Sequence, residues 1–232
     1  MKTEEYTVGE RSVRVAPWTL NRNLGGCHRC FAEALNGELL PERSSTGLGA
    51  VCASLGRQQQ DFFSGKPTSM LSKDLPAGVI RNGSGVMSRP FQHKGVALTI
   101  RGRIDAIAKL NDGRVFIVDF KTGFPNEHTA ERFRPQLSAY CWALTNPATG
   151  DARDVAGAGI LSLTPRTLRP ASHGFAHMVS TTWTPIEYDH EWFISLLETI
   201  CEITRDPTSA RSDIECEWCE IRDRLSSLGA SE

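Results

Sequence analysis

Alternating hydrophobic and polar positions in the middle of the chain predict two strands joined by a tight turn. In residues 97–110 apolar and polar side chains alternate, which is typical of a strand with one buried face. Asn111-Asp112-Gly113 is a turn sequence, and residues 114–121 again alternate. Further strands are expected at residues 155–164 and 175–186, with short strands between loops at 64–95.

Apolar residues at helical spacing predict four helices. The helices are expected over residues 17–40, 46–63 and 129–145, and from the N-cap residue Asp189 to Ile203. Gly37 and Pro41 end the first helix, and Asn146-Pro147 ends the third. Together with the hairpin, these elements favour an α/β fold with one mixed β-sheet flanked by helices.

The hairpin register brings charged residues together. A three-residue turn pairs residues whose numbers sum to 224, and only this register matches the apolar partners on one face. Asp105 then lies directly opposite Asp119, and Arg103 opposite Lys121. Because opposed like charges are destabilising, such a pair needs a shared proton or a cation between the carboxylates. A surface grid of salt bridges is the alternative.

The helix expected after the hairpin adds polar groups. Arg132, Gln136 and Tyr140 are spaced i, i+4, i+8 and share one helix face. A guanidinium, an amide and a phenol in line suit a phosphodiester and its attacking water. The alternative is an ordinary solvated helix face.

In combination, three segments resemble the PD-(D/E)xK nuclease superfamily, in its RecB-like branch, which includes the exonucleases of CRISPR adaptation. The matching segments are Gly102-Arg103-Ile104-Asp105-Ala106, Val118-Asp119-Phe120-Lys121-Thr122-Gly123 and Gln136-Leu137-Ser138-Ala139-Tyr140. The match covers roughly residues 96–165. The resemblance implies a restriction-endonuclease-like mixed β-sheet flanked by helices, in a single domain over residues 1–232.

The resemblance also implies a role for each matching residue. Asp105 and Asp119, with the backbone carbonyl of Phe120, would hold Mg²⁺ or Mn²⁺, and Lys121 would orient or activate the water. Gln136 and Tyr140 would position DNA or the metal shell, and the residues expected to bind DNA are Arg101, Arg103 and Arg132. Hydrolysis of a phosphodiester needs an in-line nucleophile and cations on the developing negative charge.

The implied activity is metal-dependent, exonuclease-like hydrolysis of DNA in repair, recombination or processing. Single strands or duplex ends are the expected substrates, and a helicase or recombination protein is considered as a partner. The second hypothesis is a weak or inactive nucleic-acid-binding or scaffold protein that retains the fold. Many RecB-like nucleases carry a histidine in an early helix, whereas residues 47–53 contain none, and His93 is the candidate substitute.

Two CxxC pairs lie near the two ends of the chain. Cys27 and Cys30 form the first, Cys216 and Cys219 the second. Paired CxxC motifs indicate a Cys₄ metal site, either zinc or iron–sulfur, and four unrelated thiols are the alternative. Since RecB-like nucleases often join their two ends with a [4Fe–4S] cluster, the resemblance favours iron–sulfur, with Zn²⁺ as the alternative. Buried structural thiols are expected at Cys52, Cys141 and Cys201.

Composition narrows the class of protein. With 232 residues, 40% hydrophobic and 23% charged, the chain is typical of a globular protein and not of a disordered, collagenous or coiled-coil one. No apolar run of 18 residues and no signal-peptide pattern is present, so no membrane segment is expected. Seven cysteines, an odd number, favour a reducing cytoplasm.

The net charge of −1 conceals an uneven distribution. Residues 81–186 contain 13 Lys and Arg against 7 Asp and Glu, whereas residues 187–223 contain 3 against 11. A basic central region is the electrostatic footprint of a phosphate-bearing partner, and a solvated face is the alternative.

Overall fold

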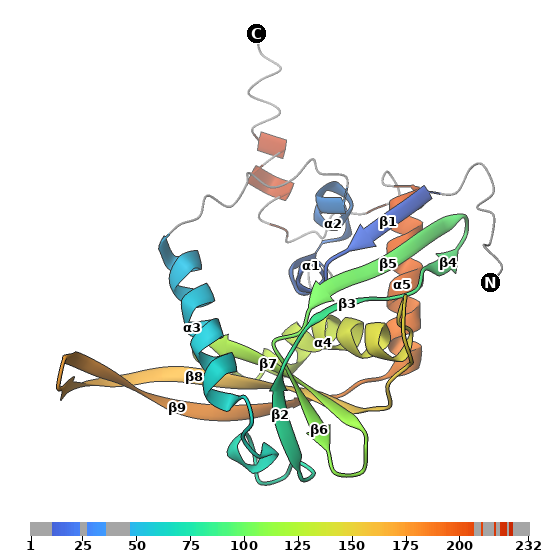
Figure 1. The fold of residues 1–232 in the computed structure, drawn as a ribbon. Coiled ribbons are helices and arrows are strands. Elements are labelled where there is room, and N and C mark those ends of the chain that lie inside the picture. The colour runs from blue at the N-terminus through green and yellow to red at the C-terminus, as the bar shows by residue number, and fades with distance from the viewer. Residues whose placement is uncertain are drawn as a thin grey trace.

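The structure is a computed structural model that describes residues 11–23, 27–35, 47–206, 210, 216, 219–221 and 223–224. Its described strands form two mixed sheets, where the sequence favours one (Figure 1). The first sheet has the order β1-β5-β3, with β4 also paired to β5, and β1 is parallel to β5. Its strands are β1 (Arg11–Val15), β3 (Gly85–Met87), β4 (Phe91–His93) and β5 (Val96–Arg103).

The second sheet has the order β2-β6-β7-β8-β9, and its β7–β8 pair is parallel while the others are antiparallel. Its strands are β2 (Gly78–Asn82), β6 (Ala106–Leu110), β7 (Val115–Thr122), β8 (Val155–Ala171) and β9 (Gly174–Ile186). The helices are α1 (Pro17–Asn23), α2 (His28–Leu35), α3 (Gly47–Phe63), α4 (Thr129–Thr145) and α5 (His190–Arg205), with a 3₁₀ turn at Thr68–Met70. None of these described helices is long and apolar enough to cross a bilayer.

The prediction of one continuous strand over residues 97–110 is wrong. The strand breaks at Ile104 and Asp105, and its halves, β5 and β6, belong to different sheets. At the break the Ile104 amide donates to the Ser84 carbonyl (3.1 Å), and the Asp105 carboxylate accepts the Phe120 amide (3.0 Å). These bonds replace the ladder bonds of a continuous strand, while the alternation of side chains continues through the break.

The predicted hairpin register is confirmed. Residues 106–109 of β6 pair with residues 115–118 of β7, and each pair sums to 224. The ladder begins at Ala106, however, so the expected direct pairs of Asp105 with Asp119 and of Arg103 with Lys121 do not form. Asp105 approaches β7 through its side chain instead.

The helix expected over residues 17–40 is two helices, α1 and α2. The sequence between them contains Gly25-Gly26, and glycine is a poor helix former; residues 36–40 lie outside the described residues. The other three helix predictions are confirmed, as are the strands at 155–164 and 175–186, although β8 continues to Ala171. In α3, Phe62, which the pattern placed on the apolar face, is 59% exposed.

Helix α4 lies between the two sheets, as Figure 1 shows. One side of the helix, with Ala139 and Trp142, packs with Leu98 of the first sheet. Its other side, with Leu137 and Cys141, packs with apolar side chains of the second sheet. The far face of the second sheet is covered by residues that include Phe63 of α3. Because α4 is packed on both sides, its residues 136–144 are held rigidly beside β7.

Gly102 in β5 is required by close packing. A Cβ atom at this position would lie 2.8 Å from Cδ of Pro17 and 3.1 Å from Cε1 of Tyr140. Because both neighbours belong to packed elements, we expect Gly102→Ala to lower the free energy of unfolding by about 1–3 kcal/mol, measured by urea denaturation. Gly85→Ala in the adjacent strand is the control, since its Cβ would meet only the Gly102 carbonyl at 3.9 Å. Equal effects of the two substitutions would contradict this explanation.

Candidate active site

Two carboxylates meet where β7 passes the break between β5 and β6. Asp119 lies on β7 and is 3% exposed. Asp105 turns its carboxylate toward β7, where Oδ2 accepts the backbone N–H of Phe120 at 3.0 Å. Its Oδ1 accepts a bond from Nε2 of Gln60, at 3.3 Å. Since Phe120 follows Asp119 directly, the two acidic groups lie side by side although the ladder has ended.

The environment of Asp119 disfavours its charge. Its Oδ1 accepts a hydrogen bond from Nε2 of Gln136 at 3.0 Å, and its Oδ2 is 2.5 Å from Nζ of Lys121. The Lys121 ammonium is therefore the ion-pair partner of Oδ2, and Oδ2 accepts no properly directed hydrogen bond within the described part of the chain. Burial raises the pKa of the Asp119 carboxyl to about 6, with Lys121 opposing the rise and Asp105 adding to it.

Gln136 is held from two directions. Its backbone N–H donates to Oδ1 of Asn21 at 3.0 Å, and Nδ2 of Asn21 donates to its side-chain oxygen. The preceding residue is Pro135, which has no N–H and disturbs the helical ladder at this turn. Helix α1 therefore fixes the amide that contacts Asp119. Asn21 was not predicted from the sequence, because no local pattern relates it to Gln136.

Tyr140 lies on the buried side of α4 and not on a polar face. It is 5% exposed, and its hydroxyl donates to the Arg103 carbonyl at 2.7 Å. Burial raises the pKa of Tyr140 well above its ordinary value, and the charge of Asp119 adds to the rise, so the phenol stays a neutral donor. This bond fixes the end of β5 just before Asp105.

A cavity of about 500 Å³ opens at Lys121, the ion-pair partner of Asp119, although neither carboxylate is among the described residues that line it. Lys121, Arg132 and His128 line it, and Ser162 of β8 contributes from the neighbouring strand. The ammonium of Lys121 lies 5.0 Å from the ring centroid of Phe133. We call this the Lys121 cavity. Its basic lining lies directly beside the acidic pair, as expected of a place that receives a phosphate group.

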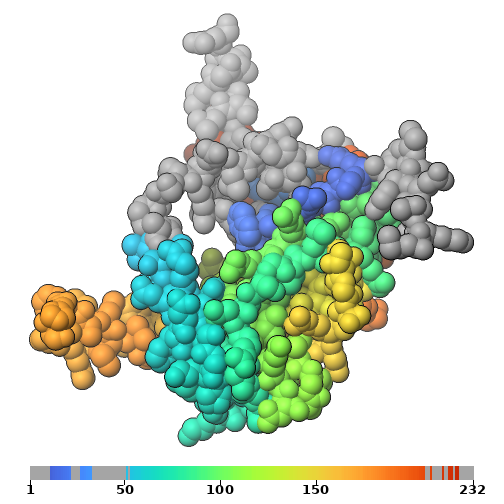
Figure 2. All heavy atoms as spheres, in the orientation of Figure 1, coloured from blue at the N-terminus to red at the C-terminus, as the bar shows by residue number. Residues whose placement is uncertain are grey.

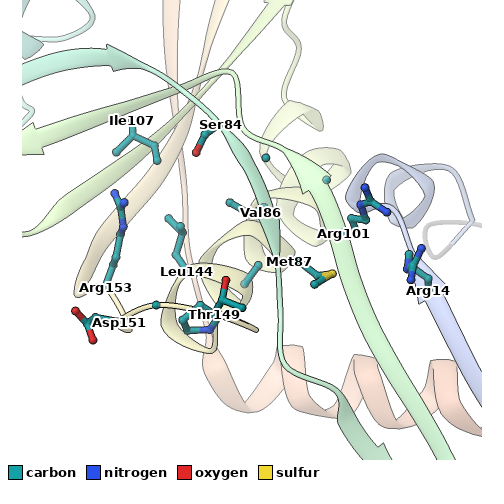
Figure 3. Close-up of a pocket in the computed structure, with 15 residues that line it drawn as sticks. Arg14, Ser84, Val86, Met87, Arg101, Ile107, Leu144, Thr149, Asp151 and Arg153 are labelled. Atoms are coloured by element: carbon teal, nitrogen blue, oxygen red, sulfur yellow. The ribbon is translucent and has the colours of Figure 1, made fainter.

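A larger cavity, of about 680 Å³, lies elsewhere, and Figure 3 shows Arg14, Arg101 and Arg153 around it. The described residues that line it include neither carboxylate. Arg103 is exposed and lines neither cavity. Of the three arginines predicted to bind DNA, Arg132 therefore lies beside the Lys121 cavity and Arg101 lies in the larger one.

His93 does not stand in for the missing histidine of the early helix. It stacks on Phe91 and lies 3.7 Å and 3.5 Å from carboxylates of Glu198 and Glu202 on α5. The side chain that reaches Asp105 from the early helix is Gln60 on α3. Gln60 was not predicted from the sequence, because the resemblance points to a histidine in residues 47–53.

The four cysteines of the two CxxC pairs come together. Their Sγ atoms all lie within 4.8 Å of one another. The Sγ–Sγ distance is 3.4 Å for Cys27–Cys219 and 3.6 Å for both Cys30–Cys216 and Cys30–Cys219. None of these four described cysteines forms a disulfide. Nearby, the Arg29 guanidinium binds both carboxylate oxygens of Asp223, at 3.2 and 3.0 Å. The four-cysteine cluster thus joins α2 to the segment around residue 219.

Burial in this cluster disfavours thiolates. It raises the pKa of the Cys30 thiol to about 11 and that of Cys219 further still. Soft thiolate donors at this spacing suit a metal, and the positive charge would stabilise their ionised form. Outside the cluster, Cys141 and Cys201 are buried as expected, and the side chain of Cys52 lies outside the described residues.

The chain is similar to a known protein family and to solved structures. A family model described as the PD-(D/E)XK nuclease superfamily matches residues 27–224 of the chain. A solved structure titled "Crystal structure of SSO0001" is similar at 15% sequence identity and a TM-score of 0.49, covering 88% of this chain and 79% of that chain. No curated protein matches. The range matched by the family model includes both carboxylates, Lys121 and all four cysteines of the cluster.

Proposed function

The chain belongs to the PD-(D/E)XK nuclease superfamily, and on this basis we propose that it is a divalent-metal-dependent DNA nuclease that uses Asp105, Asp119 and Lys121. One observation supports the proposal most strongly. The buried Asp119 carboxylate lies beside Asp105 and is paired with Lys121 at the edge of a basic cavity. Two adjacent carboxylates with an ammonium are the groups that phosphodiester hydrolysis needs.

The carboxylates fit a hard divalent cation. Oδ2 of Asp119 is buried, and within the described residues it is paired with a cation, the Lys121 ammonium, at 2.5 Å, so this oxygen already lies in a place that favours positive charge. Mg²⁺ and Mn²⁺ prefer carboxylate oxygens, and Asp105 and the backbone carbonyl of Phe120 would complete the protein's share of the ligands. When bound, such a cation supplies positive charge to the developing charge on the phosphate and acidifies water.

The chain's own residues position the reacting groups. Gln136 restricts the rotation of the Asp119 carboxylate, and Asn21 restricts Gln136. Lys121 projects into the cavity between Asp119 and the ring of Phe133. From there its ammonium can hold the attacking water or stabilise the charge of the transition state.

The activity test is cleavage of linear and circular DNA, single-stranded and duplex, with Mg²⁺, with Mn²⁺ and with EDTA. We expect cleavage of linear DNA in either metal, none in EDTA, and no cleavage of circular DNA, since the proposal is an exonuclease of the RecB-like kind. Cleavage of circles would revise the mode to endonuclease. Binding without cleavage in every metal would favour the second hypothesis, an inactive nucleic-acid-binding protein.

Lys121→Ala separates catalysis from binding. We expect single-turnover cleavage to slow by about 10²-fold or more, because the ammonium acts on water or on the transition state. The Kd for DNA, measured in Ca²⁺ by fluorescence anisotropy, is expected to stay within about threefold. Lys109→Ala, which removes an exposed lysine from β6 of the same sheet, is the control. If affinity falls as far as rate, Lys121 is only a phosphate contact.

For the four-cysteine cluster we propose a structural metal site. A single tetrahedral Zn²⁺ with Zn–S bonds of about 2.3 Å separates its sulfurs by about 3.8 Å. The separations of 3.4 and 3.6 Å are close to this value, whereas a [4Fe–4S] cluster binds each cysteine to a different iron and so holds the sulfurs farther apart. The spacing supports zinc. Elemental analysis and absorbance near 400 nm of anaerobically purified protein distinguish the two.

A further inference from the structure

Strands β8 and β9 continue past the sheet as a two-stranded arm. The last β7 residue in the ladder, Thr122, pairs with Leu163. Beyond that point residues 164–171 are paired with residues 174–180 of β9. Figure 1 shows this arm extending away from the second sheet, and in Figure 2 it stands clear of the neighbouring atoms. Most of its side chains are exposed, so the arm has no role in the core of the described structure.

One face of the arm continues the face of the sheet that carries Lys121. In the parallel ladder Lys121 is the partner of Ser162, and both line the Lys121 cavity. Two residues further along β8, the hydroxyl of Thr164 donates to the Gly123 carbonyl at 2.8 Å, on the same face. Thr164 is paired with Ser180. This face therefore leads from the cavity directly onto the arm.

Two arginines lie along this face. Arg166 is the extra residue of a bulge between Pro165 and Thr167, and its Nε donates to Oγ of Ser180 at 2.8 Å, which places it on the Thr164 side. Arg169 lies two positions after Thr167, hence on the same face. From Ser162 to Arg169 an extended strand covers roughly 20 Å, which is about the rise of six nucleotides of one DNA strand.

The charged residues of the arm, Arg166 and Arg169, are both basic. Residues 155–186 contain two arginines and two histidines, and no aspartate or glutamate. Just before the base of the arm, Ser162 lines the Lys121 cavity together with Lys121 and Arg132. The basic face is therefore continuous from the proposed reaction site to the arm. A polyanion that occupies the cavity would meet only favourable charge along this path.

The opposite face is mostly apolar, with His177, the partner of Leu168, on it as well. Leu168 is 65% exposed and Phe175 75% exposed, and each lies on the side that continues from Leu163. Such a face is also what a protein partner or a second copy would bind. The charge of the arm, its lack of acidic residues and its continuity with the cavity favour the nucleic acid as the partner of the arm.

We propose that the arm binds the phosphate backbone of the nucleic acid that enters the Lys121 cavity, with Arg166 and Arg169 as the contact residues. The proposal rests on the proposed function and adds a second contact region, several nucleotides from the reacting phosphate. The arm would lengthen the bound segment without touching the reacting groups. Short substrates that reach the cavity and not the arm would then bind less tightly.

The test is the double variant Arg166→Gln, Arg169→Gln, which keeps side chains able to hydrogen-bond. Binding to a 30-nucleotide single strand and a 30-bp duplex is measured by anisotropy in Ca²⁺ at several salt concentrations. We expect affinity to fall by about 10-fold, and the slope of log K against log salt to fall by about 1.5, as for two lost phosphate contacts. With a three-nucleotide strand, which at about 3.4 Å per nucleotide is too short to reach from the cavity to the arginines, the difference from wild type is expected to disappear.

Two control variants sharpen the test. Arg153→Gln removes one exposed positive charge at the larger cavity, and Leu168→Thr changes the apolar face of the arm. Both are expected to bind as wild type. If the double variant binds DNA as tightly as wild type, the proposal is overturned while the nuclease function stands. If Leu168→Thr weakens binding or self-association and the double variant does not, the arm is a protein-binding surface.

The proposed function and the arm can fail separately. Wild-type protein that binds DNA through the two arginines and cleaves nothing in any metal would support the arm and overturn the nuclease. If the double variant cleaves DNA and binds it with unchanged affinity and salt dependence, the nuclease function is supported and the role of the arm is overturned. Absence of any binding by wild type would overturn both.

Discussion

Replacing Asp119 with asparagine is expected to reduce metal-dependent cleavage by about 10³-fold or more while leaving the fold intact. Asparagine keeps the Oδ1 acceptor for Gln136 and removes the charge that would hold the cation. The melting temperature in EDTA is expected to equal or exceed that of wild type, because the buried charge and its repulsion by Asp105 are both removed. The unpaired Lys121 can reach water, since its side chain is 31% exposed.

The same variant changes how stability depends on pH. The pKa of Asp119 is raised in the folded protein to about 6, so the folded state binds this proton more tightly than the unfolded state. In EDTA, wild-type stability should therefore fall as pH rises from about 4 to about 6. Asp119→Asn should lose this contribution, which urea denaturation at several pH values measures.

Asp112→Asn is the matched control. Asp112 is an exposed aspartate in the turn of the same hairpin, paired with Arg114. It should retain wild-type cleavage. Full activity in Asp119→Asn, with metal dependence preserved, would remove Asp119 from the active site.

Replacing Cys219 with serine is expected to remove the bound metal and lower the melting temperature by about 10 °C. Cys219 is buried, and its Sγ lies 3.4 Å from that of Cys27, a residue 192 positions earlier. A metal at this place restricts a very long loop of the unfolded chain, and its ligand bonds exist only in the folded state. A loss of about 3 kcal/mol corresponds to roughly this shift for a protein of this size.

Cys201→Ser distinguishes loss of the metal from loss of a buried thiol. Cys201 is a fully buried core residue of α5 and lies outside the four-cysteine cluster. This control should lose stability and keep its metal. Equal metal content in Cys219→Ser and wild type, or a wild-type protein with neither zinc nor iron, would show that the four cysteines are unrelated thiols and hold no metal.

The hairpin register, the bounds of α4 and the four-cysteine cluster could be predicted from the order of residues along the chain. The register of the β6–β7 hairpin followed from the apolar pairs, and α4 was predicted from residue 129 to 145 because Asn146-Pro147 ends it. The four-cysteine cluster followed from the spacing of the two CxxC pairs. In each case the signal lies in neighbouring residues or in a recognised motif.

Features that depend on tertiary contacts were not predicted. The break at Asp105 arises from a bond between its carboxylate and the Phe120 amide, and the alternation of side chains gives no sign of it. Asn21 contacts Gln136 across 115 positions. The arm contains Pro165 and Pro170, which usually argue against a strand, and here Pro165 lies beside the bulge of an exposed pair.

The contact between Cys27 and Cys219 also determines when the four-cysteine cluster can form during synthesis of the chain. A ribosome adds about 5–20 residues per second, so residues 141–219 need roughly 4–16 s after Tyr140 has been synthesised. Until Cys216 is added, near the end of that time, the nascent chain offers a metal only the first two thiols of the cluster. The carboxylates, in contrast, are already joined by a hairpin of short sequence separation, which forms early. We therefore expect metal insertion at the cysteines to follow formation of the carboxylate hairpin and to take place only after residue 219 has been synthesised.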